Sequence, residues 1–438
     1  MTRAGSPGGT RGGASVRILR GSAAVALVGS LLAALGGVPA AAAESLLRLP
    51  LGDPSRRDRR VELVLDGITD SRTGEQLAPH DLPARLEGAR LLFVGEQHVD
   101  VEFHRIQLRV IEELQRAGRK VSIGLEMFPY TEQRSLDQWT AGLLTERGFL
   151  ELADWYEHWG YDWKYYREIL LFARDHGLAM YALNTPRDVV RAVRRKGLEN
   201  LNEEEARHVP PSIDTASAEH LRLFRAMFEE DADDDFHAAL PEAELRAMFE
   251  AQCTWDATMG HSAVQALRRD DDPRAILVVM VGAGHVAYDL GIQRQARQWF
   301  DGRMASILPV SVGDACEPEH EVQASYADFV WGVPPAEQPF HPFLGLSTTE
   351  SDGRRKVIHV SPDSPAERAG FAPGDVLLSM DGQDLSNQRT LKRLTAEKQW
   401  GDRAVFAISR GDERIERTVY LRRTRPEPCE AARAGEKP

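Results

Sequence analysis

The sequence predicts an α/β fold with a mostly parallel sheet, followed by a small β-rich domain. Apolar runs of four to eight residues alternate with longer segments of helical periodicity. Continuous apolar strands separated by amphipathic helices are typical of a parallel sheet that is covered on both faces. The second domain is indicated by the Pro-rich stretch WGVPPAEQPFHP (331–342), after which short alternating strands and turn residues follow.

The expected elements follow in order along the chain. Two short strands around a polar turn are expected within 61–78. A helix is predicted from VEFHRIQLRVIEELQRAG, with Gly118 as its stop. Residues 199–267 hold helix patterns but no strand-like run, which predicts a helical insertion or cap. The longer strands of the parallel sheet are expected at LLFV (91–94), VSIGLEMF (121–128), LAMYALN (178–184), AILVVMVGAGH (275–285) and ASILPVSV (305–312).

The N-terminal segment has the composition of a secretory signal. It combines arginines and no acid with an apolar AAVALVGSLLAALGG and a small-residue end, which predicts cleavage after Ala43. No cysteine precedes Cys253, so we expect a periplasmic or secreted protein without a lipid anchor. The expected divisions are the signal peptide (1–43), the α/β domain (44–330), a Pro-rich linker (331–341), the second domain (342–424) and a polar tail (425–438).

Charge and cysteine content narrow the classes of partner. Loss of the four signal-peptide arginines changes the formal net charge from −13 to −13 − 4 = −17. Such an acidic surface argues against nucleic acid or an anionic membrane as the main partner, and no apolar stretch after the signal is long enough to span a bilayer. In an oxidising compartment Cys316 and Cys429 would form one disulfide, with three free thiols as the alternative.

Polar and ionisable residues follow four of the expected strands. Ligands of open parallel sheets bind beyond the carboxyl ends of the strands, so these residues are expected to meet there. Gly95 and Gly284 would let the following side chains turn into the cleft. His104 is expected either as a supporting partner or as a core histidine. The residues delivered by the strands are Glu96, His98, Glu126, Asn184 and His285.

Two carboxylates and two imidazoles predict a particular chemistry. Glu96, His98, Glu126 and His285 suit a divalent cation such as Mn, Fe or Zn, or a general-base site without a metal. A buried polar network that closes the edge of the sheet is the structural alternative.

The pattern GEQH…H (95–104), GLEMF (124–128), ALNTPRDVV (182–190), QCTWDATM (252–259) and VGAGH (281–285) resembles the ChaN-like haem-binding uptake proteins of the Tiki superfamily. The resemblance implies haem binding for iron uptake, with a tyrosine or histidine as ligand of the iron. The same superfamily includes metal-dependent peptidases, so the second hypothesis is a metal-dependent hydrolase or peptidase that uses the two carboxylates and two imidazoles. The third hypothesis is a protein that is mainly an adaptor. The aromatic segment DWYEHWGYDWKYY (154–166) offers walls or ligands, unless it is helix packing. The cofactor-binding candidates are His98, His104, Tyr156, Tyr161, Asn184 and His285.

The C-terminal segment SPAERAGFAPGDVLLSMDGQDL resembles a bacterial PDZ domain. The resemblance implies that a protein C-terminus or extended peptide adds as a strand beside 346–348. A spacer or dimer contact is the alternative, and the sequence leaves open whether the chain forms a homodimer. The implied peptide-binding residues are Phe343, Leu344, Gly345 and Leu346 in the carboxylate-binding loop, with Leu391 and Leu394 on the helix.

Overall fold

The computed structural model describes residues 46–230, 241–313, 320–335, 340–351 and 353–423. The expected signal peptide, the polar tail, Cys316 and Cys429 lie outside these residues, so neither cleavage nor the disulfide is tested. Cys253 is free and buried. Within the described part of the chain, no helix combines the length and the apolar character needed to cross a membrane.

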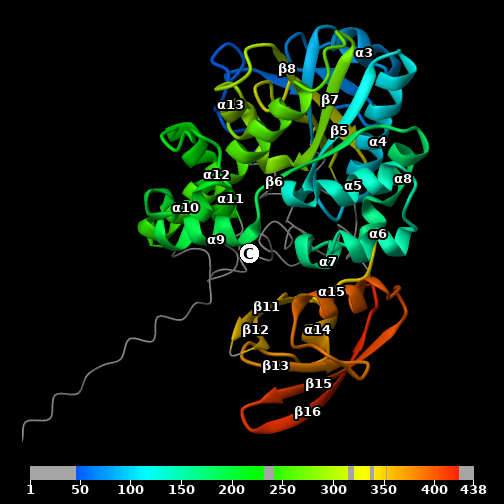
Figure 1. Ribbon diagram of the computed structural model, residues 1–438, viewed down its shortest axis with the longest axis vertical. Helices are drawn as coiled ribbons and strands as arrows, with labels where there is room; N and C mark the ends of the chain where they lie inside the picture. Colours follow the sequence, from blue (N-terminus) through cyan, green and yellow to red (C-terminus); the bar gives the residue numbers. More distant parts are fainter. Residues whose placement is uncertain (1–45, 231–240, 314–319, 336–339, 352, 424–438) are drawn as a thin grey trace, which may run out of the picture.

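An eight-stranded sheet forms the centre of the larger domain (Figure 1). Its strand order is β3-β2-β10-β8-β4-β7-β5-β6, and all neighbours from β10 to β6 are parallel. Each of the five long apolar runs lies in one of β4 to β8, which confirms the predicted fold class. The strands are β2 (Ile68–Asp70), β3 (Gln76–Leu77), β4 (Ala89–Glu96), β5 (Lys120–Pro129), β6 (Met180–Asn184), β7 (Ala275–Gly282), β8 (Arg303–Ser311) and β10 (Phe329–Val333).

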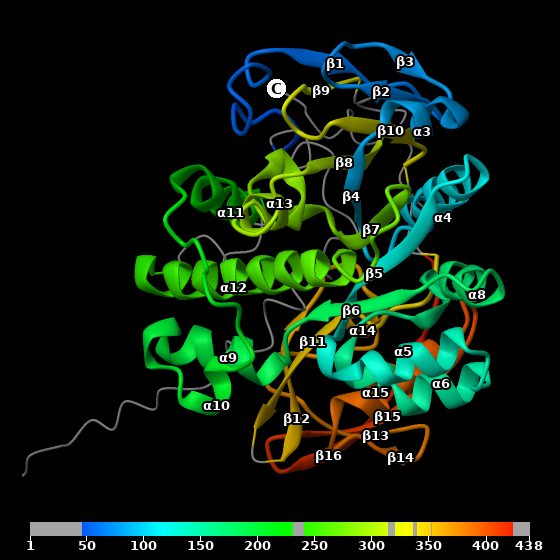
Figure 2. The same ribbon diagram turned by 45° about the horizontal axis from the view of Figure 1, so that its top comes forward.

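Helices cover both faces of this sheet, as the continuous apolar strands require. Leu92 and Val94 of β4 pack toward α4, whereas Leu91 and Phe93 pack on the opposite face, toward α12. Figure 2 shows α4 and α12 on the two sides of the strands. The covering helices are α4 (Val101–Arg116), α5 (Gln133–Thr140) and α8 (Arg167–Asp175) on one face, and α12 (Glu242–Leu267) and α13 (Ile292–Ala296) on the other.

The expected helical insertion includes part of the core. It contains η4 (Leu198–Asn200), α10 (Glu203–Ala206), α11 (Ala218–Glu230) and α12. Met259, Ala263 and Val264 of α12 are fully buried against the sheet. A long helix at the end of the segment is therefore a layer of the domain rather than a cap, and α9 (Arg187–Lys196) packs on it.

Short elements connect these layers. β1 (Arg60–Glu62) pairs with β9 (Glu321–Gln323) in a separate antiparallel sheet, and β2 and β3 form the hairpin expected within 61–78. The remaining elements are η1 (Pro79–Asp81), α3 (Leu82–Arg85), η2 (Tyr130–Glu132), α6 (Glu146–Leu152), α7 (Trp155–His158), η3 (Trp163–Tyr165), η6 (Ala283–His285) and η7 (Ala287–Asp289).

The C-terminal domain is an antiparallel sheet of order β11-β12-β13-β15-β16, with β14 beside β13. Its core includes Val357, Leu377 and Phe406. Strand β10 runs to Val333 and is buried, so the expected linker starts too early at 331: its first three residues belong to the central sheet. The elements are β11 (Leu346–Ser351), β12 (Arg354–Val360), α14 (Pro365–Arg368), β13 (Val376–Met380), β14 (Gln383–Asp384), α15 (Gln388–Ala396), β15 (Arg403–Arg410) and β16 (Glu413–Tyr420).

The two domains touch through α15 and α7 (Figure 1). Arg389 forms a 3.0 Å ion pair with Asp154. The Lys164 ammonium donates to the carbonyl of Ala396 over 2.9 Å. The C-terminal domain is thus docked beside the aromatic segment of the larger domain.

Candidate functional site

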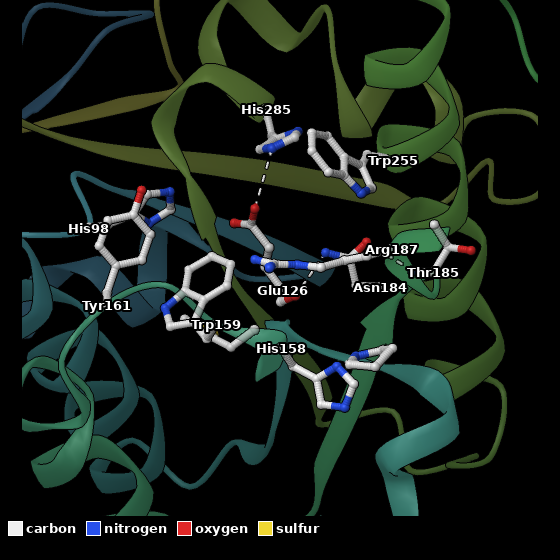
Figure 3. A pocket seen from close by; sticks show the side chains of 12 residues that line it. His98, Glu126, His158, Trp159, Tyr161, Asn184, Thr185, Arg187, Trp255 and His285 are labelled. Atoms are coloured by element: carbon white, nitrogen blue, oxygen red, sulfur yellow. Dashed lines mark hydrogen bonds and ion pairs between the residues drawn. The ribbon is translucent and has the colours of Figure 1, made fainter. Parts of the chain in front are cut away.

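A small pocket, partly open to solvent, lies at the carboxyl ends of β4, β7, β5 and β6. These four strands are neighbours in the sheet, which explains why residues far apart in the sequence meet there. Figure 3 shows the side chains around it. The lining residues are His98, Glu126, Met127, Pro129, His158, Trp159, Tyr161, Asn184, Thr185, Arg187, Trp255 and His285.

Glu96 lies behind the pocket wall and holds three side chains. The His98 Nδ1 donates to its carboxylate over 2.7 Å, the Tyr166 hydroxyl donates over 2.8 Å, and the His104 Nδ1 lies 3.1 Å from its second oxygen. Burial alone would raise the pKa of Glu96, but His104 and His98 outweigh it and hold that pKa well below its usual range. Glu96 is therefore an anion that fixes the orientation of His98.

His104 belongs to the same buried network. Its Nε2 faces the backbone carbonyl of His98 at 3.2 Å, while its Nδ1 faces Glu96. Burial opposes its charge, but the Glu96 carboxylate raises the pKa of His104. With an acceptor at each nitrogen, the ring is a cation that supports the wall and does not line the pocket.

His98 presents its other edge to the pocket. Its ring packs against Trp159 and Tyr161, with centroids 5.0 and 4.4 Å away. A Cβ on Gly282 would lie 3.3 Å from the His98 Nε2, so a glycine leaves room for the ring. No described residue forms a hydrogen bond with this Nε2, and it is available to a ligand.

His285 is held on both sides. Its Nδ1 lies 2.5 Å from an Asp256 oxygen, and its Nε2 lies 3.4 Å from a Glu126 oxygen. Burial would lower the pKa of His285, but Asp256 and Glu126 outweigh burial and raise it to about 10. The other Glu126 oxygen accepts the backbone N–H of Gly282 over 2.7 Å. His285 is therefore an imidazolium clamped between two carboxylates, and neither nitrogen is free to ligate a metal.

Three buried donors along the pocket lack partners among the described residues: the Trp159 Nε1 and two that point to a ligand more directly. The Tyr161 hydroxyl and the Trp255 Nε1 form no hydrogen bond with any residue that the structure describes. Burial, and then the charges of Glu126 and Glu96, raise the pKa of Tyr161 well above its usual value. A buried polar group without a partner costs free energy, so both atoms are suited to meeting a ligand.

The remaining pocket wall comes from the end of β6 and the start of α9. The Asn184 amide donates to the backbone carbonyl of Glu126 over 2.9 Å, and its oxygen accepts the N–H of Thr185. Arg187 donates to the carbonyl of Glu157 over 3.2 Å, and burial lowers its pKa. Asn184 thus fixes the turn that brings Arg187 to the pocket.

The structure sorts the predicted site residues into three groups. His98, Glu126, Tyr161, Asn184 and His285 line the pocket together. Glu96 and His104 lie behind it, and Tyr156 lies elsewhere, on α7, where charges of α15 act on it.

Of the two reasons for expecting glycine at a strand exit, close approach and a turn of the backbone, the first applies to Gly95. A Cβ there would lie 2.1 Å from the Leu308 Cδ2 and 3.1 Å from the Ala283 Cα. The residue is glycine because the strand packs closely, not because the backbone turns, since Glu96 is still part of β4.

The predicted metal site stays a prediction. Glu96 with His98 and Glu126 with His285 form separate pairs rather than one ligand set. Among the described residues, no group of three or more His, Cys, Asp or Glu side chains is arranged to hold a metal ion.

Sequence reasoning missed several residues of the site. Gln252, Trp255 and Asp256 occupy one face of α12, at the i, i+3, i+4 spacing of helical neighbours. The Gln252 amide lies 2.9 Å from the same His285 nitrogen as Asp256. That spacing was visible in QCTWDATM. Arg187 gave no comparable signal.

The implied peptide-binding residues lie around the edge strand β11. Gly345 has φ 77°, and a Cβ there would lie 2.1 Å from the Ser364 Cβ, so the loop requires glycine. Leu344, Leu391 and Leu394 are buried in the domain core, whereas Phe343 and Leu346 are partly exposed. Peptide binding stays a prediction for all of them.

Comparison with protein families agrees with this geometry. Residues 82–295 match the model described as haem-binding uptake, Tiki superfamily, ChaN, and residues 342–421 match the PDZ domain. The chain thus contains a ChaN-like domain at 82–295 and a C-terminal PDZ domain. The ChaN-like match contains every residue that lines the pocket.

Individual relatives are more distant. The chain is 27% identical to Protein RETICULATA-RELATED 5, chloroplastic, of Arabidopsis thaliana over 47% of this chain and 28% of that protein. It is 35% identical to the putative serine protease HhoA of Synechocystis over 16% of this chain and 18% of that protein. It thus spans less than a third of these curated relatives. A solved structure of ChaN from Campylobacter jejuni, described by its cofacial heme binding, covers 60% of this chain and is itself covered to 95%, at 17% identity and a TM-score of 0.45.

Proposed function

We propose that the ChaN-like domain binds haem in the pocket between His98, Tyr161 and Trp255. The observation that carries the proposal is the pair of donor atoms on one wall: the Tyr161 hydroxyl, which is buried and unpartnered among the described residues, beside the open edge of His98. Haem would supply an iron ion, which the Tyr161 oxygen or the His98 nitrogen would ligate.

The other pocket residues fit the same group. Haem needs an apolar, aromatic slot around its ring, and Trp159, Trp255 and Met127 supply such surface. The carboxylate of Glu96 on the far side of His98 is the kind of partner that orients a histidine ligand and raises its basicity. His285 is excluded as a ligand because both its nitrogens face carboxylates.

The wider proposal concerns the whole chain. The N-terminal sequence supports export to the periplasm or beyond, where such a protein would serve iron uptake. The edge strand β11 supports recognition of a protein C-terminus or extended peptide by the PDZ domain. A metal-dependent hydrolase and an adaptor remain the alternative predictions.

Titration of the purified full-length chain with hemin tests the proposal. A Soret band is expected to grow to saturation, and Tyr161→Phe or His98→Gln is expected to shift its maximum and weaken binding. The matched control is Tyr156→Phe. Tyr156 belongs to the same aromatic segment, but it lies on α7 near α15 and does not line the pocket. The proposal is wrong if all three variants behave alike, or if His98→Gln loses stoichiometric Mn or Zn while hemin produces no Soret band.

A further inference from the structure

Four basic side chains lie within range of one another's charges where the two domains touch. Arg187 and Arg191 come from the start of α9 in the ChaN-like domain, and Arg355 and Lys392 come from β12 and α15 of the PDZ domain. Arg187, Arg355 and Arg191 all lie close enough to Lys392 for their charges to lower its pKa. Glu157 is the carboxylate that opposes them there.

Lys392 is partly buried and has no counterion in contact among the described residues. Its ammonium lies 3.6 Å from the place of a Cβ on Gly160, and no described residue forms a hydrogen bond or ion pair with it. Burial, followed by the charge of Arg187, lowers the pKa of Lys392 to about 7. A partly buried ammonium near three guanidinium groups is unfavourable unless an anion joins them.

Arg355 also has a donor without an acceptor. Its side chain is only 9% exposed, its Nε has no hydrogen-bond partner in the described part of the chain, and one of its other nitrogens lies 3.7 Å from Glu350. A guanidinium group presents a planar fork of donors that matches a carboxylate. The Arg355 Nε is therefore able to donate a hydrogen bond to a bound carboxylate.

Arg187 connects this cluster to the pocket, because it also lines the pocket wall (Figure 3). We propose that Arg187, Arg191, Arg355 and Lys392 form a carboxylate-binding site shared by the two domains at the mouth of the pocket. The inference rests on the proposed function, since a haem in the pocket would present its propionate carboxylates there. The PDZ domain then completes the ligand site of its neighbour.

A first experiment tests the site without haem. Lysines of the full-length chain are acetylated with acetic anhydride near neutral pH, in acetate or in chloride at equal ionic strength, and the products are quantified by mass spectrometry. A carboxylate beside a lysine raises its pKa by about one unit or more, so acetate should slow the modification of Lys392 about tenfold. Lys356, which is exposed on the same strand as Arg355, is the internal control. Equal slowing of both lysines, or of neither, overturns the proposal.

A second experiment identifies the source of the carboxylate. The wild-type chain should bind hemin about tenfold more tightly than hemin dimethyl ester, and Lys392→Met should remove that preference, whereas Lys356→Met should keep it. If hemin and its ester bind the wild type equally, the propionate assignment is refuted while haem binding stands. If neither binds but acetate protects Lys392, the proposed function fails and the carboxylate site stands. In that case, a peptide with a free C-terminus is compared with the same peptide amidated at its C-terminus. Protection of Lys392 by the first peptide alone would identify a peptide C-terminus as the source of the carboxylate.

Discussion

The charge on His285 should make the stability of the protein depend on pH in a way that Asp256 controls. His285 is buried with its Nδ1 at 2.5 Å from Asp256, and its pKa is raised from 6.5 to about 10. A group whose pKa is higher in the folded state contributes stability that is fully present below pH 6.5. That stability is lost as the pH rises toward about 10.

The size of the change in the free energy of unfolding follows from the pH range between the two pKa values of His285. Each pH unit between the two pKa values changes the ratio of folded to unfolded protein up to tenfold through this one proton. From pH 6.5 to pH 9 the free energy of unfolding should therefore fall by about 3 kcal/mol. Asp256→Asn keeps the shape and an acceptor for the Nδ1 but removes one negative charge, so the pKa of His285 should fall and the window should narrow.

Urea denaturation of both proteins across this pH range measures the effect. At pH 6.5 the variant should be less stable than the wild type by about 2 kcal/mol or more, because a buried ion pair has lost one partner. The difference should shrink steadily toward pH 9, since the wild type by then has lost most of the stabilisation. A difference that stays constant with pH would refute the reasoning, because it would show that Asp256 stabilises by shape and hydrogen bonding alone.

Two further changes test the packing around the site. Gly95→Ala should lower the free energy of unfolding by about 1–3 kcal/mol, because the new Cβ would lie 2.1 Å from the Leu308 side chain and close to the Ala283 backbone; an unchanged melting temperature would contradict this. Tyr166→Phe removes a 2.8 Å hydrogen bond to the buried Glu96 carboxylate and should cost about 2 kcal/mol in urea denaturation. Tyr156→Phe is its control, and an equal loss in both variants would show that the bond to Glu96 has no special value.

The sheet and the edge that carries the site could be predicted because both depend on local patterns. Short apolar runs such as LLFV and AILVVMV, separated by amphipathic helices, are typical of parallel strands covered on both faces, and such strands end at one edge. The position of Tyr156 could not be predicted in this way. It lies on α7, which contacts α15, and the sequence does not show which residues of the aromatic segment turn toward the pocket and which toward the PDZ domain.

Asp256 was missed for a different reason. It lies in a helix whose residues are mostly buried on all sides, so its periodicity does not single out a polar face. Its ion pair with His285 depends on the packing of α12 against the end of β7, which the sequence does not show. The spacing of Gln252, Trp255 and Asp256 suggests a shared face but not the residue that the face meets.

The two imidazoles, which the sequence presents as equivalent, are distinguished by where their carboxylates stand. His98 has its carboxylate on one side only, at Nδ1, so the opposite edge of the ring is directed to the pocket. His285 has carboxylates on both sides, at Nδ1 and Nε2, so the ring carries a positive charge and no free lone pair. If the proposed function holds, a ligand with an electron-poor metal centre would therefore bind at His98 and Tyr161 rather than at His285. His285 can act on such a ligand only through its charge, which the surrounding Glu126 and Asp256 largely neutralise.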